Sequence, residues 1–439
     1  MRVMFTTFAA KSHLHIQIPL AWALRSAGHD VCVASQPDLV EYITHTGLTA
    51  VGVGENLDLD VQMAGANRRR DRTEEVAGDP DFLTHADLSG LDPDRHTYPY
   101  LRGAFELMAG HVYPALSSDA MIGDLVDFAR HWKPDLVVWD THTFAGAIAA
   151  TVTGAAHARL LFGADLLAHS RRTFLRERDL LPAAERSDPL ADWLGGILDR
   201  YDRPFTEEVV TGRWAVDPVP ASMRLPSDQH HVPVRYVPYN GPSVLPDWLS
   251  EPVERPRVCL TLGWSGRDVL GADRASVGEL LDAVAEVDAE VVATLSAAQL
   301  DRSGKVPDNV RVTDFVPLDA LLPTCSAVIH QGGAGTFQTA QLHGVPQIIV
   351  PDLLWDYGYK MRHVESTGSG LAVHDVDGFT AEQLRSMLVR LLVEPSFARN
   401  AAVVRREMLG MPAPRDVVPV LERLTAEYHR SPGTPPAAR

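Results

Sequence analysis

The sequence predicts an α/β fold with two doubly wound domains, each built on a parallel sheet. Short apolar runs typical of β-strands alternate with helix-like segments along most of the 439 residues. The alternation forms two series, and a segment with five prolines between residues 233 and 252 separates them. A chain of this length exceeds one ordinary core and suits two or three domains. We therefore expect two Rossmann-like domains that face each other across a cleft.

The first series opens with strand, helix and strand. Residues 2–8 are an apolar strand, residues 9–15 are expected to be a loop, and an amphipathic helix follows in which Pro19 occupies the first turn. Gly28 stands where a glycine commonly follows the last turn of a helix. The next strand is expected at residues 30–36. A strand, a crossover helix and a second strand imply a parallel sheet, with ligands at the carboxyl ends of its strands.

A second strand–helix unit places Asp140 directly after the apolar run "DLVVW". Two polar, weakly periodic stretches, about 54–100 and 171–226, are expected to be insertions in the N-terminal domain. The first of them is either a lid over a site or a tolerated surface excursion. The later series has strands at 257–263, 290–295, 310–316, 327–331 and 346–351. The expected boundaries are 1–232 for the N-terminal domain, 233–252 for a linker, 253–411 for the C-terminal domain, 412–430 for a helix packing back on the N-terminal domain, and 431–439 for a disordered tail.

Composition and charge exclude several classes of function. The formal net charge of -17 opposes nucleic acid or an anionic membrane as the main partner. Cys32, Cys259 and Cys325 lie far apart and show no metal-binding or redox spacing, so reduced cysteines in or near the core are expected. No apolar run approaches the length of about 20 residues that spans a bilayer. These features predict a cytoplasmic protein.

The densest glycine cluster follows a strand and opens a helix. Residues 331–336 read "QGGAGT", and His330 precedes them. A helix that begins there directs unpaired N–H groups and the positive end of its dipole at an anion. Glycines at 332, 333 and 335 leave room for a phosphate, Thr336 adds a hydroxyl, and His330 adds a ring N–H. The alternative is that these glycines only allow tight packing between strand and helix.

Other strand ends of the same half carry further binding candidates. Ser265 follows the first strand of this half and could meet phosphate, and Phe315 with the backbone of Val316 could hold a nucleobase. In isolation, Phe315 would read as an ordinary core aromatic. Asp356 follows a later strand, where its carboxylate could accept sugar hydroxyls or cap a helix.

Together these motifs resemble a known family. The run "FVPLDALLPTCSAVIHQGGAGTFQTAQLHGVPQIIVPDLLWD" is similar to the nucleotide-sugar signature of GT-B family 1 glycosyltransferases. The opening "TTFAAKSHLHIQIPLAWALRSAGHDVCVASQPDL", the linker "VRYVPYNGPSVLPDWL" and the segment "WDYGYK" resemble actinobacterial enzymes that attach deoxysugars, often aminosugars, to macrolide or aromatic polyketide aglycones. The resemblance covers nearly the whole chain and is weakest in the middle insertions.

The resemblance implies a donor site in the C-terminal half for a TDP-deoxysugar. The sequence departs from the common pattern in three places: Gln331 replaces a frequent second histidine, Phe315 replaces a stacking tryptophan, and "WDYGYK" replaces the usual Asp-Gln or Asp-Thr end. The last departure affects recognition of the donor sugar. The implied donor residues are Gly263, Ser265, Phe315, Val316, His330, Gly332, Gly333, Ala334, Gly335 and Thr336 for the nucleotide and its diphosphate, with Asp356 and Tyr357 for the sugar.

Transfer to a hydroxyl needs a base in the N-terminal half. His13 is the first candidate, because it follows the first strand at the rim of the sheet, and the resembling family uses a histidine on this segment. His15 is the alternative base. Asp140 is the second catalytic candidate, although it could instead cap the next helix, and the carboxylate that orients His13 stays open. Glu106 and His111 are weaker options. No DxD-type carboxylate pair follows a suitable strand, so we expect a reaction without metal. We also expect the transfer to invert the anomeric configuration.

The acceptor is expected to be a polyketide aglycone. Phe105, Met108 and Phe144 could line its pocket, although such residues at helical spacing are more often core. The resemblance also implies a P450-like auxiliary protein, and a homodimer is another possible assembly. Two other functions compete with the transferase: a sugar-nucleotide epimerase of GT-B fold, and a helper protein that keeps the fold without the chemistry.

Overall fold

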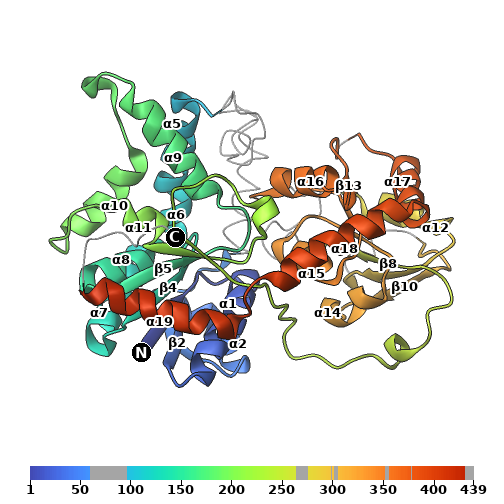
Figure 1. Ribbon diagram of the computed structural model, residues 1–439, viewed down its shortest axis with the longest axis horizontal. Helices are drawn as coiled ribbons and strands as arrows, with labels where there is room; N and C mark the ends of the chain where they lie inside the picture. Colours follow the sequence, from blue (N-terminus) through green and yellow to red (C-terminus); the bar gives the residue numbers. More distant parts are fainter. Residues whose placement is uncertain are drawn as a thin grey trace. The chain divides into compact units, whose positions relative to one another are not determined.

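The computed structural model describes residues 1–59, 96–263, 275–297, 299–300, 305–351, 355–376 and 378–430. The chain divides into two compact units (Figure 1). Unit 1 comprises Met1–Arg235 and Pro412–Arg439, and unit 2 comprises Tyr236–Met411. The predicted tail at 431–439, and most of the predicted insertion at 54–100, lie outside the described residues. Within the described residues, no helix is both long and apolar enough to cross a membrane.

Unit 1 is built on a parallel sheet whose described strands number seven, in the order β3-β2-β1-β4-β5-β6-β7. The order reverses between β1 and β4, which lie side by side, so their carboxyl ends form the topological switch point of this sheet. The strands are β1 Arg2–Thr6, β2 Asp30–Ser35, β3 Thr49–Gly52, β4 Leu136–Asp140, β5 Ala156–Leu160, β6 Trp214–Asp217 and β7 His231–Pro233.

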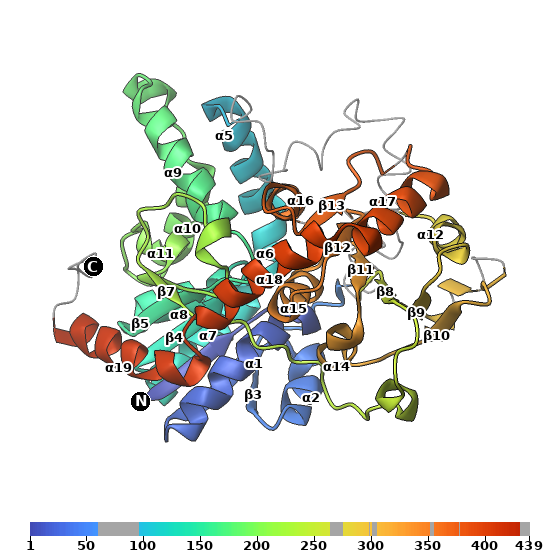
Figure 2. The same cartoon turned by 45° about the vertical axis from the view of Figure 1, so that its right-hand side comes forward.

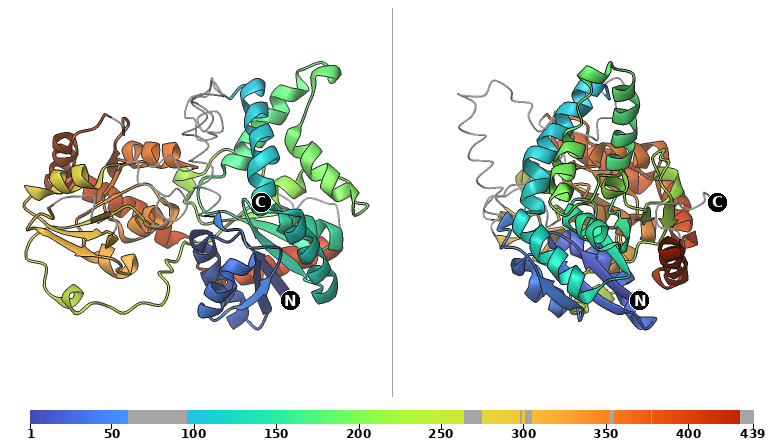
Figure 3. Two further views of the ribbon diagram at one scale, coloured as in Figure 1. Left: turned by 180° about the vertical axis from the view of Figure 1, so that it is seen from behind. Right: turned by 90° about the vertical axis from the view of Figure 1, so that its left-hand side faces the viewer.

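Helices cover this sheet. The long α5 and α9 lie side by side (Figures 2 and 3), with Phe105 of α5 packed against Phe174 of α9. The helices of unit 1 are α1 Lys11–Ser26, α2 Pro37–His45, α5 Tyr98–Leu107, the π-helix η2 Met108–Val112, α6 Tyr113–Leu116, α7 Asp119–Trp132, α8 Phe144–Thr153, α9 Leu166–Asp179, α10 Pro189–Asp199, α11 Glu208–Thr211 and α19 Pro414–Arg430, with short 3₁₀ turns η3 Ala183–Glu185 and η4 Ala221–Met223.

Helix α19 joins unit 1 from the far end of the chain. It lies against α1 (Figure 2). His29, which follows α1, contacts Glu422 with 3.0 Å between Nε2 and Oε1. The backbone N–H of Arg235 donates to the carbonyl of Pro412 over 2.7 Å, where the chain leaves and re-enters the unit. These contacts attach the last described helix to the sheet that the first residues of the chain build.

Unit 2 repeats the plan with a parallel sheet of six described strands in the order β10-β9-β8-β11-β12-β13. Its order reverses between the neighbouring strands β8 and β11. The elements are η5 Asp247–Ser250, β8 Arg257–Thr261, α12 Val277–Ala285, β9 Glu290–Thr294, β10 Val310–Thr313, α14 Leu318–Leu321, η7 Leu322–Thr324, β11 Ala327–His330, α15 Ala334–His343, β12 Gln347–Ile349, α16 Tyr357–Ser366, β13 Gly370–Ala372, α17 Ala381–Val393 and α18 Pro395–Gly410.

Alternate residues of the unit 2 strands enter two separate cores. Val258 and Leu260 of β8 pack with α12 and α17 on one face, whereas Cys259 packs with α14 and α15 on the other. Burial on both faces explains why these strands read as continuous apolar runs. Cys32, Cys259 and Cys325 are free thiols, as expected. The predicted fold class, two α/β domains each on a parallel sheet, is confirmed.

The first helix begins earlier than the sequence predicts. Helix α1 starts at Lys11, so the expected loop at 9–15 supplies its first turn, and Pro19 lies inside the helix instead of in its first turn. The buried residues Leu14 and Ile18 already lie one turn apart, and burying them compensates for the N–H that Pro19 lacks. The predicted end is confirmed, because Gly28 has a φ of +91° after the last turn.

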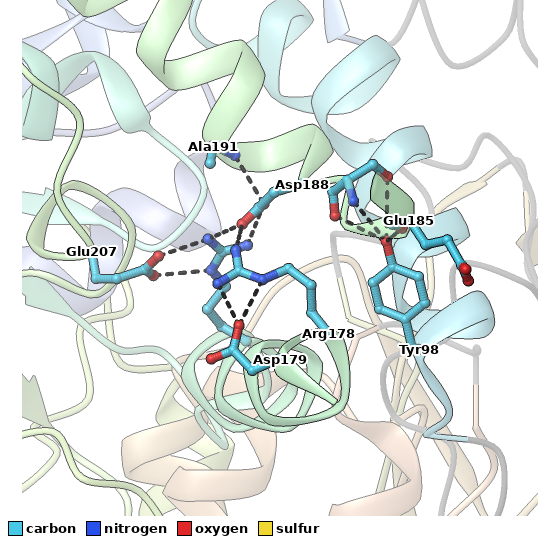
Figure 4. A network of polar contacts seen from close by, with 9 residues as sticks. Tyr98, Arg178, Asp179, Glu185, Asp188, Ala191 and Glu207 are labelled. Atoms are coloured by element: carbon cyan, nitrogen blue, oxygen red, sulfur yellow. Dashed lines mark hydrogen bonds and ion pairs between the residues drawn. The ribbon is translucent and has the colours of Figure 1, made fainter. Parts of the chain in front are cut away.

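The stretch 171–226 is not the irregular insertion that the sequence suggests. It forms most of α9, all of α10 and α11, and β6 of the main sheet. Its charges pair with one another: Arg171 donates to both carboxylate oxygens of Asp188 over 2.6 and 2.7 Å, and to Glu207 over 2.7 and 3.0 Å. Figure 4 shows this cluster with Arg178, which donates to Asp188 over 2.8 Å. Charged residues that pair with one another interrupt the apolar periodicity of a helix, so these helices cannot be predicted from that periodicity.

Candidate active site

The switch point of unit 1 brings together His13 and Asp140. Strands β1 and β4 are paired in register, with Thr6 beside Trp139. His13 lies in the first turn of the helix that follows β1, and Asp140 is the last residue of β4. Nδ1 of His13 lies 2.7 Å from Oδ2 of Asp140. Asp140 is therefore the carboxylate that contacts His13, a question that the sequence leaves open.

The environment of Asp140 keeps its carboxylate ionised. Its exposed fraction is 1%. Burial raises the pKa of Asp140, but the electrostatic attraction and hydrogen bond of His13, together with the hydrogen bond from the backbone N–H of His142, outweigh burial, and the net shift is downward. An ionised carboxylate can only accept, so His13 donates its Nδ1–H, and the free lone pair lies on Nε2. The side chain of His13 is 18% exposed, so the pair His13 and Asp140, called the dyad below, offers an oriented base that a substrate can reach.

Asp140 also anchors the loop that follows it. Its Oδ1 accepts the backbone N–H of His142 over 2.9 Å. The side chain of Asp140 does not cap α8 directly, because Thr143 is the residue at the N-cap position of that helix. Asp140 thus contacts His13 with one carboxylate oxygen and the following loop with the other, and its catalytic role stays a prediction.

Aromatic rings restrict the rotation of His13. The ring centroids of Phe8 and Phe162 lie 4.5 and 4.8 Å from that of His13, and the ring of His142 lies 5.8 Å away. Burial lowers the pKa of His142 to about 4, so this second histidine is neutral at physiological pH. The dyad therefore has apolar or neutral rings around its hydrogen bond, and these limit competition from water.

His15, the alternative base, is engaged elsewhere. Its Nε2 lies 2.6 Å from the hydroxyl of Tyr42, and the two rings stack at 5.6 Å. Burial and the charge of Lys11 lower the pKa of His15 to about 4. Lys11 itself lies over the Tyr42 ring, with Nζ 5.3 Å from the centroid. Both side chains are thus part of the packing between α1 and α2.

The expected acceptor residues are core. Phe105 and Phe144 are fully buried and Met108 is 7% exposed. Phe105 packs on Phe174 at 5.3 Å, and Phe144 packs on Tyr113 at 4.6 Å. These three residues therefore belong to the hydrophobic core and do not line a pocket, because an amphipathic helix directs its apolar side chains inward. The weaker base candidates Glu106 and His111 are exposed. Unit 1 does contain a groove of about 620 Å³, lined by Ala109, Gly110, Pro114, Ser117, Ser118, Asp119, Trp193, Gly196, Ile197 and Arg200.

The switch point of unit 2 carries the glycine loop. Residues 331–333 join the end of β11 to α15, and Gly333 is the N-cap residue of α15. Among the described residues, no side chain caps this helix, and its first turn has no acidic residue, so the early N–H groups from Ala334 onward keep their capacity to bind an anion. Thr336, also in the first turn, is buried.

Gly263 meets this loop from the neighbouring strand end. It follows β8 with a φ of +68°, and a Cβ at this position would lie 2.0 Å from Nε2 of Gln331. A Cβ on Gly333 would lie 3.0 Å from the same atom. The side chain of Gln331 therefore fills the space between Gly263 and Gly333. A side chain at either glycine would collide with it.

His330 differs from the expectation that its ring N–H contacts phosphate. The side chain is fully buried, and burial lowers its pKa to about 4. Its Nδ1 lies 3.0 Å from the backbone nitrogen of Gly332, and its Nε2 lies 2.9 Å from Oε1 of Gln347. Both ring nitrogens of His330 therefore form hydrogen bonds within the protein, and neither is directed at the expected phosphate.

The remaining donor candidates lie at other strand ends of unit 2. Phe315, two residues after β10, is 36% exposed, whereas Val316 is 2% exposed and belongs to the core that contains α14. Asp356 is fully buried and forms an ion pair with Lys360, and Tyr357 opens α16. Ser265 lies outside the described residues. Among the described residues, no group of three or more His, Cys, Asp or Glu side chains could hold a metal ion; metal independence stays a prediction.

Buried histidines predict acid sensitivity. Burial lowers the pKa values of His142, His157 and His330 to about 4, against about 6.5 in an unfolded chain. Between these values the unfolded chain binds more protons, so stability is complete above about pH 6.5 and declines as pH falls toward 4. Urea unfolding at pH 8, 7, 6 and 5 should give similar midpoints at pH 8 and 7 and lower midpoints at 6 and 5. A constant midpoint down to pH 5 would contradict the neutral, buried state of these rings.

Comparison with protein families gives two matches that together span most of the chain. The model described as "Erythromycin biosynthesis protein CIII-like, N-terminal domain" matches residues 22–263. The model of the corresponding C-terminal domain matches residues 278–424. The first match alone covers more than half of the 439 residues.

Individual relatives match over nearly their whole length. An aclacinomycin-T 2-deoxy-L-fucose transferase from Streptomyces galilaeus is 56% identical over 438 residues, covering 99% of this chain and 98% of the relative. A 10-deoxymethynolide desosaminyltransferase from Streptomyces venezuelae is 46% identical over 433 residues, covering 98% and 99%. The crystal structure of glycosyltransferase VinC in complex with dTDP superimposes with a TM-score of 0.85 at 42% identity, covering 97% of this chain and 100% of VinC.

Proposed function

The chain belongs to the erythromycin biosynthesis protein CIII-like family of GT-B glycosyltransferases, and we propose that it uses His13 as the base that activates its acceptor. It transfers a deoxysugar from a TDP-sugar to a polyketide aglycone in antibiotic biosynthesis, as the names of its relatives and the dTDP complex of VinC indicate. The observation that carries the proposal is the 2.7 Å contact between His13 and Asp140 at the switch point of unit 1.

In the proposed reaction, a hydroxyl of the aglycone attacks the anomeric carbon of the donor sugar. The hydroxyl proton passes to Nε2 of His13, the new carbon–oxygen bond forms, and the bond from the anomeric carbon to the diphosphate oxygen breaks. Asp140 stabilises the imidazolium that results. Direct displacement inverts the anomeric configuration. The carboxylate of Asp140 stays ionised throughout, in keeping with its lowered pKa.

Unit 2 is proposed to hold the donor and stabilise the leaving group. The TDP that departs gains negative charge on its terminal phosphate, and the N–H groups at the start of α15 provide fixed donors for that charge. Phe315 is proposed to stack on thymine beside the backbone of Val316, and Ser265, which lies outside the described residues, stays a predicted ligand of the diphosphate. This arrangement needs no metal, because the helix N-terminus supplies the positive potential. An amino group on the donor sugar is a further proposal, and it rests on relatives such as the desosaminyltransferase.

The paired base favours the transferase over the two competing functions. A non-catalytic helper has no use for a histidine held by a buried carboxylate, and an epimerase that works by elimination needs an acid that can protonate a glycal. Assays with the purified chain separate these cases. We expect TDP release and glycoside formation, by mass spectrometry, only when both TDP-deoxysugar and aglycone are present, with or without a metal chelator. Equal TDP release without an acceptor would contradict transfer as the activity.

The same assay tests the assembly. The resemblance suggests a P450-like auxiliary protein, a homodimer and a cytoplasmic location, all of which stay predictions. A chain that needs an auxiliary protein should show low turnover alone and much higher turnover when the companion is added. Full turnover of the purified chain by itself would contradict that requirement. Sedimentation in the same buffer would report whether the active form is a dimer.

A glycine variant tests the donor site. Gly263→Ala places a Cβ against Gln331 in a backbone conformation that costs a non-glycine residue about 1–2 kcal/mol. We expect calorimetry to show about 10-fold weaker TDP binding. Gly410→Ala, at the end of α18, is the matched control, because a Cβ there meets nothing within 4 Å. Equal TDP affinity in wild type and Gly263→Ala would remove this loop from the donor site.

A further inference from the structure

Both backbone groups of Gly332 are held by buried side chains. Its N–H donates to Nδ1 of His330 over 3.0 Å, and its carbonyl accepts from Nζ of Lys360 over 2.9 Å. The φ of +91° at this residue is a conformation that glycine adopts readily. The peptide groups on either side of Gly332 therefore have fixed directions, and the next residue is the N-cap of α15.

The contact with His330 is fixed by a second residue. Because Nδ1 accepts from Gly332, the ring proton lies on Nε2, which donates to Oε1 of Gln347 over 2.9 Å. Gln347 belongs to β12, beside β11, and is 1% exposed. A neutral ring with one defined tautomer follows, in agreement with the low pKa of His330.

The contact with Lys360 is fixed in the same way. Asp356, the N-cap residue of α16, and Lys360, one turn into that helix, form an ion pair, with side chains 0% and 4% exposed. A buried ammonium is costly unless a counter-ion and acceptors surround it. Asp356 supplies the counter-ion, and the carbonyl of Gly332 supplies an acceptor. The sequence places this pair in "WDYGYK", the segment that departs from the common pattern.

We infer that His330, Gln347, Asp356 and Lys360 form a clamp on Gly332 that orients the N–H groups at the start of α15 toward the donor diphosphate before the donor binds. Gln347, Lys360 and Asp356 are positioning residues: they act through Gly332 and touch no substrate. The inference rests on the proposed function, because it takes the start of α15 as the diphosphate site. It replaces two expected ligand contacts, those of His330 with phosphate and Asp356 with sugar, by contacts with the loop.

Preorganisation gives the clamp its effect on binding. A flexible glycine loop loses conformational entropy when it orders around a ligand, and a loop already held in place loses less. TDP affinity should therefore depend on Lys360 and Asp356, although TDP lacks the donor sugar that Asp356 was expected to contact.

The test compares Lys360→Met and Asp356→Asn with wild type, using TDP and thymidine as ligands in calorimetry. Losing a hydrogen bond to a charged group weakens binding by about 10- to 100-fold, and we expect that loss for TDP only. Thymidine, which lacks the diphosphate, should bind within about twofold of wild type. The matched control is Arg390→Met, which breaks an exposed pair with Glu394 at the same i,i+4 spacing on α17. That variant should bind both ligands normally.

Each outcome decides a different question. Failure of wild type to bind TDP would overturn the proposed function. Normal TDP binding by wild type and by both variants would overturn the clamp alone. Equal loss of TDP and thymidine would also overturn it, because a merely structural role weakens every ligand of the unit.

A second measurement needs no disruptive variant. Nitrogen-15 NMR of the wild-type protein should show His330 neutral and protonated on Nε2 at pH 7. A proton on Nδ1 would overturn the clamp, since that nitrogen could not accept from Gly332.

A conservative variant completes the comparison. Lys360→Arg keeps a cation beside Asp356 and should recover much of the TDP affinity that Lys360→Met loses.

Discussion

Replacing His13 with alanine is expected to lower kcat for glycoside formation by about 10²- to 10⁴-fold, the usual contribution of a general base. TDP affinity should stay within about twofold of wild type, because the proposed donor residues belong to unit 2 and His13 belongs to unit 1. The reason for the loss is direct. Without Nε2 the acceptor hydroxyl keeps its proton as it attacks, because the imidazole that Asp140 orients is gone.

A matched histidine on the same helix serves as the control. His15→Gln removes a ring that lies two residues away and that bonds Tyr42. Its kcat should fall by less than about threefold, since glutamine can keep a hydrogen bond to the phenol. Turnover should be followed by chromatography of the glycoside at saturating donor and acceptor. Wild-type kcat in His13→Ala, or a larger loss in His15→Gln, would remove His13 from its proposed role.

The sequence was most informative for strands whose carboxyl ends are followed by candidate site residues. Strands followed by His13, Asp140 and the glycine loop could be recognised because each strand of a doubly wound sheet is buried on both faces and reads as an apolar run. The sequence analysis does not predict β5, β6 and β13, which end without such a motif. Short strands carry little periodicity, and β6 lies inside a stretch rich in charge.

Contacts between distant residues explain what sequence reasoning missed at the sites. Asp140 could be proposed as catalytic from its place after a strand, but its contact with His13, 127 positions away, depends on the register of β1 and β4. Gln347 carried no signal, because a single glutamine in an apolar run suggests nothing about a histidine on the next strand. Lys360 did carry one: its i,i+4 spacing from Asp356 is the spacing of a helical ion pair.

The Asp140→Asn variant should lose about as much activity as His13→Ala, about 10²- to 10⁴-fold in kcat, although it changes one atom. Oδ1 of Asp140 accepts the backbone N–H of His142 over 2.9 Å, and Oδ2 faces Nδ1 of His13 over 2.7 Å. An asparagine must keep its carbonyl oxygen on the N–H of His142, because two donors cannot face each other. Its amide nitrogen then faces Nδ1 of His13.

That nitrogen is a donor, so Nδ1 of His13 must become the acceptor and the ring proton moves to Nε2. An Nε2 that carries a proton cannot take another from the acceptor hydroxyl, and the base is blocked by its own tautomer. Asp140→Ala leaves His13 free to adopt either tautomer, so its kcat should exceed that of Asp140→Asn. The comparison is made at saturating substrates and confirmed by nitrogen-15 NMR of the His13 ring. If the alanine variant were the slower one, orientation of the tautomer would not be the function of Asp140, and stabilisation of the imidazolium by its charge would account for the larger share of its effect.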